Sequence, residues 1–476
     1  MKGFGTGIAT GAMSTIVAEM MQNLAARSRA MLRRGREDEG GRRRADGADF
    51  DLVSAGESLL SRRGEAAGVV LARLMLDAYA RQSQAEKRAF LLALADRFGA
   101  NLEQIDEALR TYRDSPNPAA IKALHHATEP RRQELIRRLN LAPGGTAALV
   151  RMREDTLGEL ATCPELKPLD DDFVHLFSSW FNRGFLQLKP IDWNTSASIL
   201  EKIIRYEAVH AITDWQDLRN RLAPADRRCF GFFHPQLADE PLIFVEVALT
   251  RGMSEAIAPL LDFDHEVISP EAATTAVFYS ISNTQKGLAG VSFGNFLIKQ
   301  VVEDLKQALP NLETFVTLSP VPGFAQWLTR ERQAETSSWL DEATRAALVV
   351  LDEPDWHKDR EKAEALRPVL IAAAARYYIL AKRADGRPID AVARFHLGNG
   401  ARLERINFLG DVSAKGLSQS HGLLVNYLYA VDDIEKNHEL FFEHGEIAAS
   451  AQIRKMLRED PIAPTRASGS ALVNAG

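Results

Sequence analysis

The sequence predicts an α+β protein in which an all-helical N-terminal domain is followed by a mixed-sheet domain. Apolar residues recur at helical spacing over residues 51–183, whereas short β-rich runs between turn residues begin after 184. A chain of 476 residues is long enough for two or three domains. We therefore expect a flexible segment over 1–50, a helical domain over 51–183, a sheet domain over 184–460 and a flexible tail over 461–476.

The composition excludes several classes of protein. A hydrophobic content of 46% and a charged content of 26% are ordinary for a soluble globular chain, and the net charge of −6 argues against a general nucleic-acid binder. Because no run of 18 apolar residues occurs, no membrane span is expected. Two cysteines, Cys163 and Cys229, cannot form a disulfide scaffold, which favours the reducing cytoplasm. They could pair only if the fold brought them together.

The first 183 residues show helices from about residue 51 onward but no catalytic motif. Residues 1–50 contain the Arg-rich run "RSRAMLRRGREDEGGRRRADG" and lack the apolar core of a secretory signal, so we expect a solvated tail. Helical stretches such as "EAAGVVLARLMLDAYARQ" and "AEKRAFLLALADRF" follow, with breaks at "DSPNP" and "LAPGG". His125 and His126 are adjacent, so on a helix they point about 100° apart and do not chelate a metal together. A packing or oligomerisation domain is the resulting prediction.

The sheet domain is predicted element by element. "CFGFFH" and "PLIFVEVALT" are expected to be two strands joined by a turn, and "AVFYSIS" a third. The long helix "FGNFLIKQVVEDLKQAL" presents Leu297, Val301 and Leu305 as one apolar stripe that covers the sheet. The strand "TFVTLSP" comes next, and a strand–helix–strand unit implies a right-handed crossover with parallel pairing. Helices are expected between residues 331 and 367, and one amphipathic helix over 432–460.

A glycine-rich turn separates the third strand from the long helix. Gly287 and Gly290 lie between "AVFYSIS" and the helix, and Gly294 is the second residue of the helical stretch itself. Unpaired N–H groups and the positive end of the dipole mark a helix start, and glycines let that backbone approach a ligand closely. Such a turn suits a phosphate or pyrophosphate. Its spacing is neither a Walker A motif nor a Rossmann fingerprint, and close packing alone is an equally valid reason for the glycines.

The order of these elements resembles the GCN5-related N-acetyltransferase fold, in which such a turn binds the pyrophosphate of coenzyme A. Four separated motifs give a closer resemblance: "FYSISNTQKGLAGVSFGNFLIKQVV", "LSPVPGF", "RFHLGNGARLERINFLGDVSAKG" and "GLLVNYLY". They look like the motifs of malonyl-CoA decarboxylases, in that family's order, over roughly residues 170–430. The resemblance implies an acetyltransferase-like catalytic domain. It also implies a lyase that converts malonyl-CoA to acetyl-CoA and CO2, with no metal or prosthetic group.

The resemblance also implies site residues. The family's catalytic serine falls on Ser319 and its catalytic histidine on His396, and a tyrosine near the acyl group falls on Tyr429. The turn that contacts malonyl-CoA falls on Ala289, Gly290, Val291, Ser292, Phe293, Gly294 and Asn295. Animal members of the family have a glutamate at the position of Ser292, so any catalytic share of that glutamate is in doubt here. The chain ends "LVNAG" without the peroxisomal Ser-Lys-Leu, which fits a bacterial cytoplasmic enzyme.

The implied chemistry needs two kinds of group. Loss of CO2 leaves a thioester enolate, whose oxygen must be stabilised and whose carbon must be protonated. A histidine that titrates near neutral pH is suited to proton delivery, so His396 is expected to be the proton donor and Ser319 its partner.

Each of these residues also has an ordinary structural explanation. Ser319 precedes a proline and would cap a turn, and His396 is expected on a strand before the "GNG" hairpin turn. Asn426 and Tyr429 would be polar positions on a helix, "HGLLVNYLYA".

Two other functions stay open on the sequence. One is a CoA-dependent acyltransferase, which would need an acceptor channel and a general base. The other is a non-catalytic CoA-binding assembly protein whose helical domain is the interaction surface. In every case malonyl-CoA or a related thioester is the expected ligand, and a homo-oligomer, dimer or tetramer, through the helical domain is the expected assembly.

Overall fold

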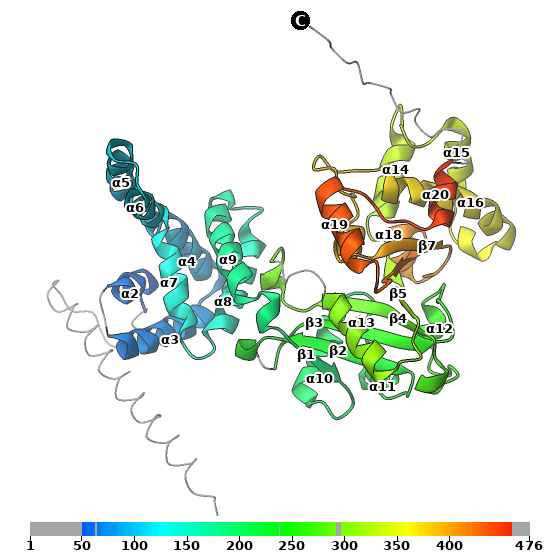
Figure 1. The fold of residues 1–476 in the computed structure, drawn as a ribbon, viewed down its shortest axis with the longest axis horizontal. Helices are drawn as coiled ribbons and strands as arrows, with labels where there is room; N and C mark the ends of the chain where they lie inside the picture. The colour runs from blue at the N-terminus through cyan, green and yellow to red at the C-terminus, as the bar shows by residue number, and fades with distance from the viewer. Residues whose placement is uncertain (1–49, 62–63, 238, 292–296, 459–476) are drawn as a thin grey trace, which may run out of the picture. The chain divides into compact units, whose positions relative to one another are not determined.

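Helices form the first part of the structure, a computed structural model that describes residues 50–61, 64–237, 239–291 and 297–458 (Figure 1). The predicted flexible segments over 1–50 and 461–476 fall outside these residues, apart from Phe50. The helices are α2 (Leu52–Leu60), α3 (Glu65–Arg81), α4 (Gln84–Arg97), α5 (Leu102–Asp114), α6 (Pro118–Thr128), α7 (Arg131–Asn140), α8 (Gly145–Glu159) and α9 (Lys167–Trp180). The starts of α2, α4, α5 and α6 are marked by side-chain caps, for example the capping box of Ser83 with Glu86 at α4.

The helical part has a core of its own. Its fully buried side chains include Leu91, Phe98, Leu135, Phe173 and Phe177. The hairpin of α5 and α6 is different, because those two helices bury only Ala108 and Ala120. The chain divides into two compact units, and the helical unit contains residues 1–182 together with two short later segments, 235–237 and 285–292.

The second unit is built on a mixed sheet. Its first elements are β1 (Gln187–Ile191), α10 (Ala197–Tyr206), α11 (Trp215–Leu222), β2 (Arg227–Phe233), β3 (Pro241–Thr250), α12 (Ala258–Leu261), β4 (Thr275–Asn283), α13 (Leu297–Ala308), β5 (Thr314–Thr317) and β6 (Ser319–Pro320). The strands lie in the order β1-β2-β3-β4-β5-β8-β6, and β7 pairs with β8. The strands β4 and β5 run parallel, as the crossover through α13 requires. Leu297, Val301 and Leu305 of α13 are buried as expected.

The remaining elements follow in the C-terminal part of this unit. They are α14 (Phe324–Gln333), α15 (Glu342–Ala347), α16 (Arg360–Ile379), α17 (Ala391–Gly398), β7 (Arg402–Asn407), α18 (Ala414–Ser420), β8 (Leu424–Leu428), α19 (Ile434–His444) and α20 (Ala451–Arg458). The helices expected between residues 331 and 367 are present. The α+β fold class, with helices first and a mixed sheet second, is confirmed. None of the helices in the described ranges is long and apolar enough to cross a membrane.

Three local predictions were wrong. His396 lies in helix α17, which Asp390 caps by accepting a hydrogen bond from the Ala393 N–H; the strand β7 begins only after the "GNG" turn. The stretch "HGLLVNYLYA" was expected to be a helix, but it contains strand β8, and Tyr429 directly follows that strand. A strand buried on both faces is apolar throughout, so its hydrophobic pattern does not distinguish it from a buried helix. The expected helix over 432–460 is two helices, α19 and α20, and α19 ends at Gly445 with a φ of 63°.

The sheet opens between two parallel strands. Pairing of β4 with β5 covers Thr275–Phe278 against Thr314–Thr317, and the last link is the Leu318 N–H bonded to the Phe278 carbonyl at 2.9 Å. Beyond this point β4 continues to Asn283, whereas the chain after Leu318 pairs with β8 instead. The two strands therefore diverge just before Ser319.

Candidate active site

A cavity of about 230 Å³ lies where the two strands diverge. Its walls come from β4, from the segment around β6, from α17 and from Val209, and the lining residues are Val209, Phe278, Tyr279, Ile281, Asn283, Leu318, Ser319, Pro320, Ala391, Val392, Phe395 and His396. Most of these side chains are apolar, and none of the twelve is a lysine, arginine or carboxylate. Two of the sequence-predicted site residues, Ser319 and His396, thus line one pocket.

Ser319 is held by pairing with β8 and by a neighbouring threonine. It forms a register pair with Val425, and it is 5% exposed. Its hydroxyl donates to the hydroxyl oxygen of Thr317 at 2.8 Å. Thr317 in turn accepts a hydrogen bond from the Tyr427 N–H at 3.1 Å. The serine oxygen therefore has a fixed position at the pocket wall.

His396 connects Ser319 to Tyr429. Its Nε2 lies 3.1 Å from Ser319 Oγ, and its Nδ1 lies 2.9 Å from the Tyr429 hydroxyl. The Tyr427 ring stacks on the imidazole, with centroids 4.5 Å apart and an angle of 24° between the planes. Three residues that are far apart in sequence are thus joined into one chain of hydrogen bonds, Ser319–His396–Tyr429.

Burial decides the protonation of this chain. It lowers the pKa of His396 to about 3, so the imidazole is neutral at pH 7. It also raises the pKa of Tyr429, so the phenol keeps its proton. The Tyr429 O–H therefore donates to Nδ1, and the ring hydrogen of His396 sits on Nε2, directed at Ser319. His396 was expected to titrate near neutral pH, whereas in the structure it is a neutral hydrogen-bond donor at that pH.

The segment between α10 and α11 fixes one wall of the pocket. The Glu207 carboxylate accepts from the N–H groups of Val209 and His210, both at 2.8 Å, and from the Ser280 hydroxyl at 2.7 Å. Arg221 donates to the His210 carbonyl at 2.8 Å. These bonds hold Val209 at the cavity.

Sequence reasoning overlooked several of these supporting residues. Thr317 precedes Ser319 by two positions, which on a strand places both side chains on one face, so the spacing alone could have identified it. Val209 and Asn283 carried no such signal, because only the folded chain brings them to the pocket. Asn426 was considered only as a polar helix residue, and here it donates to the Thr317 carbonyl at 2.7 Å from strand β8.

The glycine turn is described only in its first part. Ala289, Gly290 and Val291 follow the short 3₁₀ helix η5 (Lys286–Leu288), while the other predicted binding residues, Ser292, Phe293, Gly294 and Asn295, lie outside the described residues. Gly290 has a φ of 74°, and nothing lies within 4 Å of the position a Cβ would take. This first part of the turn belongs to the helical unit, whereas Ser319, His396 and Tyr429 belong to the other unit.

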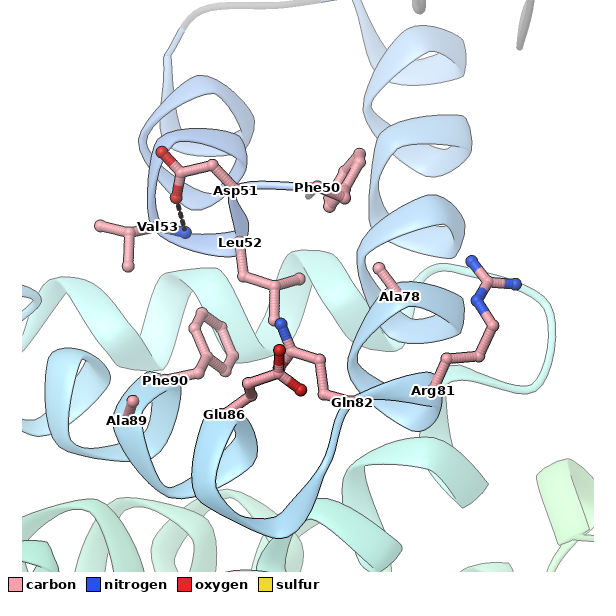
Figure 2. A pocket seen from close by; sticks show the side chains of 10 residues that line it. All are labelled: Phe50, Asp51, Leu52, Val53, Ala78, Arg81, Gln82, Glu86, Ala89 and Phe90. Atoms are coloured by element: carbon pink, nitrogen blue, oxygen red, sulfur yellow. Dashed lines mark hydrogen bonds between the residues drawn. The ribbon is translucent and has the colours of Figure 1, made fainter. Parts of the chain in front are cut away.

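A second, larger cavity of about 600 Å³ lies in the helical unit, and Figure 2 shows the side chains around it. Its lining residues are Phe50, Asp51, Leu52, Val53, Ala78, Arg81, Gln82, Glu86, Ala89 and Phe90. No histidine, serine or cysteine is among these ten, so this cavity offers no nucleophile or general acid of the kind found beside β6.

Metal-ligand clusters and cysteine thiols are two other kinds of possible site. In the part of the chain that the structure describes, no group of three or more His, Cys, Asp or Glu residues is placed to hold a metal ion. Cys163 and Cys229 are both buried and both free thiols, and burial raises the pKa of Cys229 well above its ordinary value.

Comparison with known proteins gives consistent matches. Residues 184–466 match the family model described as "Malonyl-CoA decarboxylase C-terminal domain", and residues 98–181 match "Malonyl-CoA decarboxylase N-terminal domain". The mitochondrial malonyl-CoA decarboxylase of Anser anser anser is 37% identical over 349 residues, covering 68% of this chain and 69% of that protein. The mitochondrial enzyme of Rattus norvegicus is 33% identical over 414 residues, covering 80% and 84%.

Two crystal structures are similar over most of the chain. The malonyl-CoA decarboxylase of Rhodopseudomonas palustris is 61% identical with a TM-score of 0.84, covering 86% of this chain and 100% of that one. The malonyl-CoA decarboxylase of Agrobacterium vitis is 58% identical with a TM-score of 0.82, covering 86% and 99%. The similarity thus includes both the helical and the sheet-containing parts.

Proposed function

Since the chain belongs to the malonyl-CoA decarboxylase family, we propose that Ser319, His396 and Tyr429 carry out its reaction at the pocket beside β6. The reaction is the conversion of malonyl-CoA to acetyl-CoA and CO2, and the enzyme is a carboxy-lyase. The observation that supports this site best is the hydrogen-bonded chain Ser319–His396–Tyr429 on the wall of the cavity.

The pocket favours loss of the carboxylate. None of its twelve described lining residues is a lysine or arginine that could pair with a malonyl carboxylate. An ionised carboxylate placed among apolar side chains such as Phe278, Ile281 and Val392 loses its hydration without gaining a counter-ion. Cleavage of the carbon–carbon bond moves that charge onto the thioester, where it is delocalised as an enolate, and releases neutral CO2. The apolar lining therefore favours the transition state over the bound ground state.

The neutral histidine supplies the proton through the serine. The enolate carbon takes the hydroxyl proton of Ser319, and the hydrogen on His396 Nε2 moves to Ser319 Oγ. The Tyr429 hydroxyl proton moves to Nδ1 in the same relay, so the imidazole stays neutral and the negative charge ends on the Tyr429 oxygen. One proton from solvent then restores the phenol and the starting tautomer, so the overall reaction consumes malonyl-CoA and one proton and yields acetyl-CoA and CO2. This route is consistent with a histidine whose pKa is about 3, because no imidazolium is needed.

The rest of the substrate is assigned to the glycine turn. Ala289, Gly290 and Val291, together with Ser292, Phe293, Gly294 and Asn295, are proposed to contact the pyrophosphate of CoA. The N–H groups of Ala289 and Val291 donate to the Lys286 and Leu288 carbonyls, so of these first three residues Gly290 is proposed to supply the backbone N–H. The proposal requires no metal, biotin or other prosthetic group. Self-association through the helical unit is proposed as the assembly, with the cytoplasm as the compartment.

A single incubation tests the function. Purified protein is mixed with malonyl-CoA alone, and the thioesters are separated by chromatography. Acetyl-CoA and CO2 in equal amounts, without any acyl acceptor, are expected. Consumption of malonyl-CoA only when an amine is added would instead indicate an acyltransferase, and binding without turnover would indicate a non-catalytic CoA-binding protein.

A further inference from the structure

Arg153 is a buried arginine with two separate partners inside the helical unit. Its side chain is 2% exposed and lies on helix α8. Its Nε donates to Asp170 Oδ1 at 2.9 Å, and its Nη1 donates to the carbonyl oxygen of Gly287 at 2.8 Å. Gly287 belongs to η5, the start of the glycine turn, so the turn is bonded to a helix more than a hundred residues earlier in the sequence.

The same turn packs closely against the α8 backbone. A Cβ at Gly287 would lie 1.9 Å from the carbonyl oxygen of Val150, a distance no side chain tolerates. Gly287 therefore serves close packing, in contrast to Gly290, where an added Cβ would meet open space. The sequence allowed two explanations for the glycines, close packing and approach to a ligand. Close packing against α8 explains Gly287, whereas Gly290 has the open surroundings that a ligand would need.

Resting on the proposed binding of CoA at this turn, we propose that Arg153 is a positioning residue for CoA. By fixing the Gly287 carbonyl, the guanidinium holds the turn in a conformation in which the Ala289 and Val291 N–H groups bond to the Lys286 and Leu288 carbonyls, both at 3.0 Å. This arrangement leaves the Gly290 N–H as the group that the turn directs to CoA. Helix α8 thereby acts on thioester binding without touching the thioester. This gives the helical unit a role in substrate affinity besides self-association.

The geometry makes arginine necessary at this position. Two different nitrogens of one planar guanidinium serve Asp170 and Gly287 at the same time. Asp170 also accepts from Lys167 at 3.2 Å, so it keeps one cation if Arg153 is altered. A lysine at position 153 would carry one compact charge, which can pair with Asp170 but does not reproduce the fork that also reaches Gly287.

The test uses the full chain and three variants. Arg153→Lys keeps the charge next to Asp170, Arg153→Met removes it, and Arg151→Met is the matched control on the exposed side of the same helix. Affinity for acetyl-CoA is measured by calorimetry, malonyl-CoA turnover gives kcat and KM, and thermal unfolding identifies a temperature at which all variants are folded. For Arg153→Lys we expect acetyl-CoA affinity to fall about tenfold to a hundredfold, the usual effect of losing one charge-assisted hydrogen bond.

Which parameter changes separates positioning from stability. If Arg153 positions the turn, KM rises for Arg153→Lys much more than kcat falls, Arg153→Met is at least as impaired, and Arg151→Met behaves like the wild type. Acetyl-CoA affinity equal to that of the wild type in a folded Arg153→Lys variant would overturn the inference. Failure of the proposed function is seen separately, as absence of malonyl-CoA turnover in the wild type. Failure of the turn as a CoA site is seen as unchanged affinity after substitution of Gly290.

Discussion

At the scale of single residues, burial determines the protonation states of the candidate site. The motifs "LSPVPGF" and "RFHLGNG" led to the prediction that Ser319 and His396 take part in the reaction, and the structure puts their polar atoms 3.1 Å apart. What no motif conveys is the protonation state. A histidine enclosed between Tyr427 and Tyr429 is neutral at pH 7, because desolvation opposes the charged form.

The first prediction concerns the coupling of the two residues. Ser319→Ala and His396→Asn should each lower kcat strongly, by about 100- to 10,000-fold as is typical for loss of a proton-transfer group. The double variant should be hardly slower than the slower single variant, because both residues serve one proton route. Turnover of malonyl-CoA, affinity for acetyl-CoA and melting temperature are measured for all three.

Two outcomes would contradict this coupling. If the two single losses multiply in the double variant, Ser319 and His396 act independently. If either single variant is folded and turns over substrate nearly as fast as the wild type, that residue has no part in the reaction. Ser178→Ala, an exposed serine in the helical unit, controls for the loss of a hydroxyl in general.

The second prediction concerns stability as a function of pH. The pKa of His396 is about 3 in the folded protein and about 6.5 in an unfolded chain. Between these values the unfolded chain binds a proton that the native protein does not, so acid favours unfolding. This histidine should therefore remove about 1.4 kcal/mol of unfolding free energy per pH unit as the pH falls from 6.5 toward 3.

The measurement is a difference between wild type and His396→Asn. Urea unfolding at pH 7, 6 and 5 should show the wild type losing stability more steeply than the variant. His210 and His421, whose pKa values are also lowered by burial, to about 4, are present in both proteins and cancel in the difference. His125→Asn, at an exposed position of α6, is the control. Parallel stability curves for wild type and His396→Asn would show that the imidazole is not held neutral.

At the scale of elements, the sequence predicted the strands β2 to β5 and the helix α13 because their patterns are regular. It failed at α17 and β8 for physical reasons. Helix α17 begins at the N-cap Asp390, but it is short and ends at the "GNG" turn. That turn is typical of a hairpin, so the residues before it were predicted to be a strand. Strand β8 pairs with β5, β6 and β7, and its apolar run is buried on both sides. The edge strand β1 contains a proline and only one buried side chain, Ile191. It therefore lacks the alternation of apolar and polar residues by which a strand is recognised in a sequence, and it was not predicted.

The third prediction uses the conformation of the glycine turn. Gly290 has a φ of 74°, and nothing in the described chain lies within 4 Å of an added Cβ, so backbone strain is the main effect expected of Gly290→Val. Gly386 is a matched control, with a φ of 76° and equally open surroundings in a different turn. Both variants should lose a similar amount of stability, about 1–2 kcal/mol. Only Gly290→Val should bind acetyl-CoA more weakly, as measured by calorimetry. Equal affinity in the two variants would remove the turn from the CoA site.

At the scale of the whole molecule, the proposed catalytic residues and the start of the glycine turn belong to different compact units. The hydrogen-bonded chain from Ser319 to Tyr429 lies within the sheet-containing unit, and the start of the glycine turn is bonded within the helical unit. The sequence identified the helical region correctly but assigned it only to packing or self-association. It could not reveal the link to the turn, because the hydrogen bond between Arg153 and Gly287 spans 134 positions and follows no local pattern.

The last prediction concerns self-association. The hairpin of α5 and α6 exposes two large apolar side chains, Leu102 at 75% and Ile121 at 56%, while burying only two alanines. If this hairpin is the contact between copies, Leu102→Glu combined with Ile121→Glu should yield a smaller particle in light scattering, because carboxylates are not tolerated in an apolar interface core. Phe263→Glu, at a side chain that is 54% exposed in the other unit, should leave the particle size unchanged. Turnover of malonyl-CoA should persist in the double variant, since Leu102 and Ile121 belong neither to the pocket beside β6 nor to the glycine turn. An unchanged particle size in the folded double variant would show that the hairpin is not the interface, and a shift caused by Phe263→Glu would place the interface on the sheet-containing unit instead.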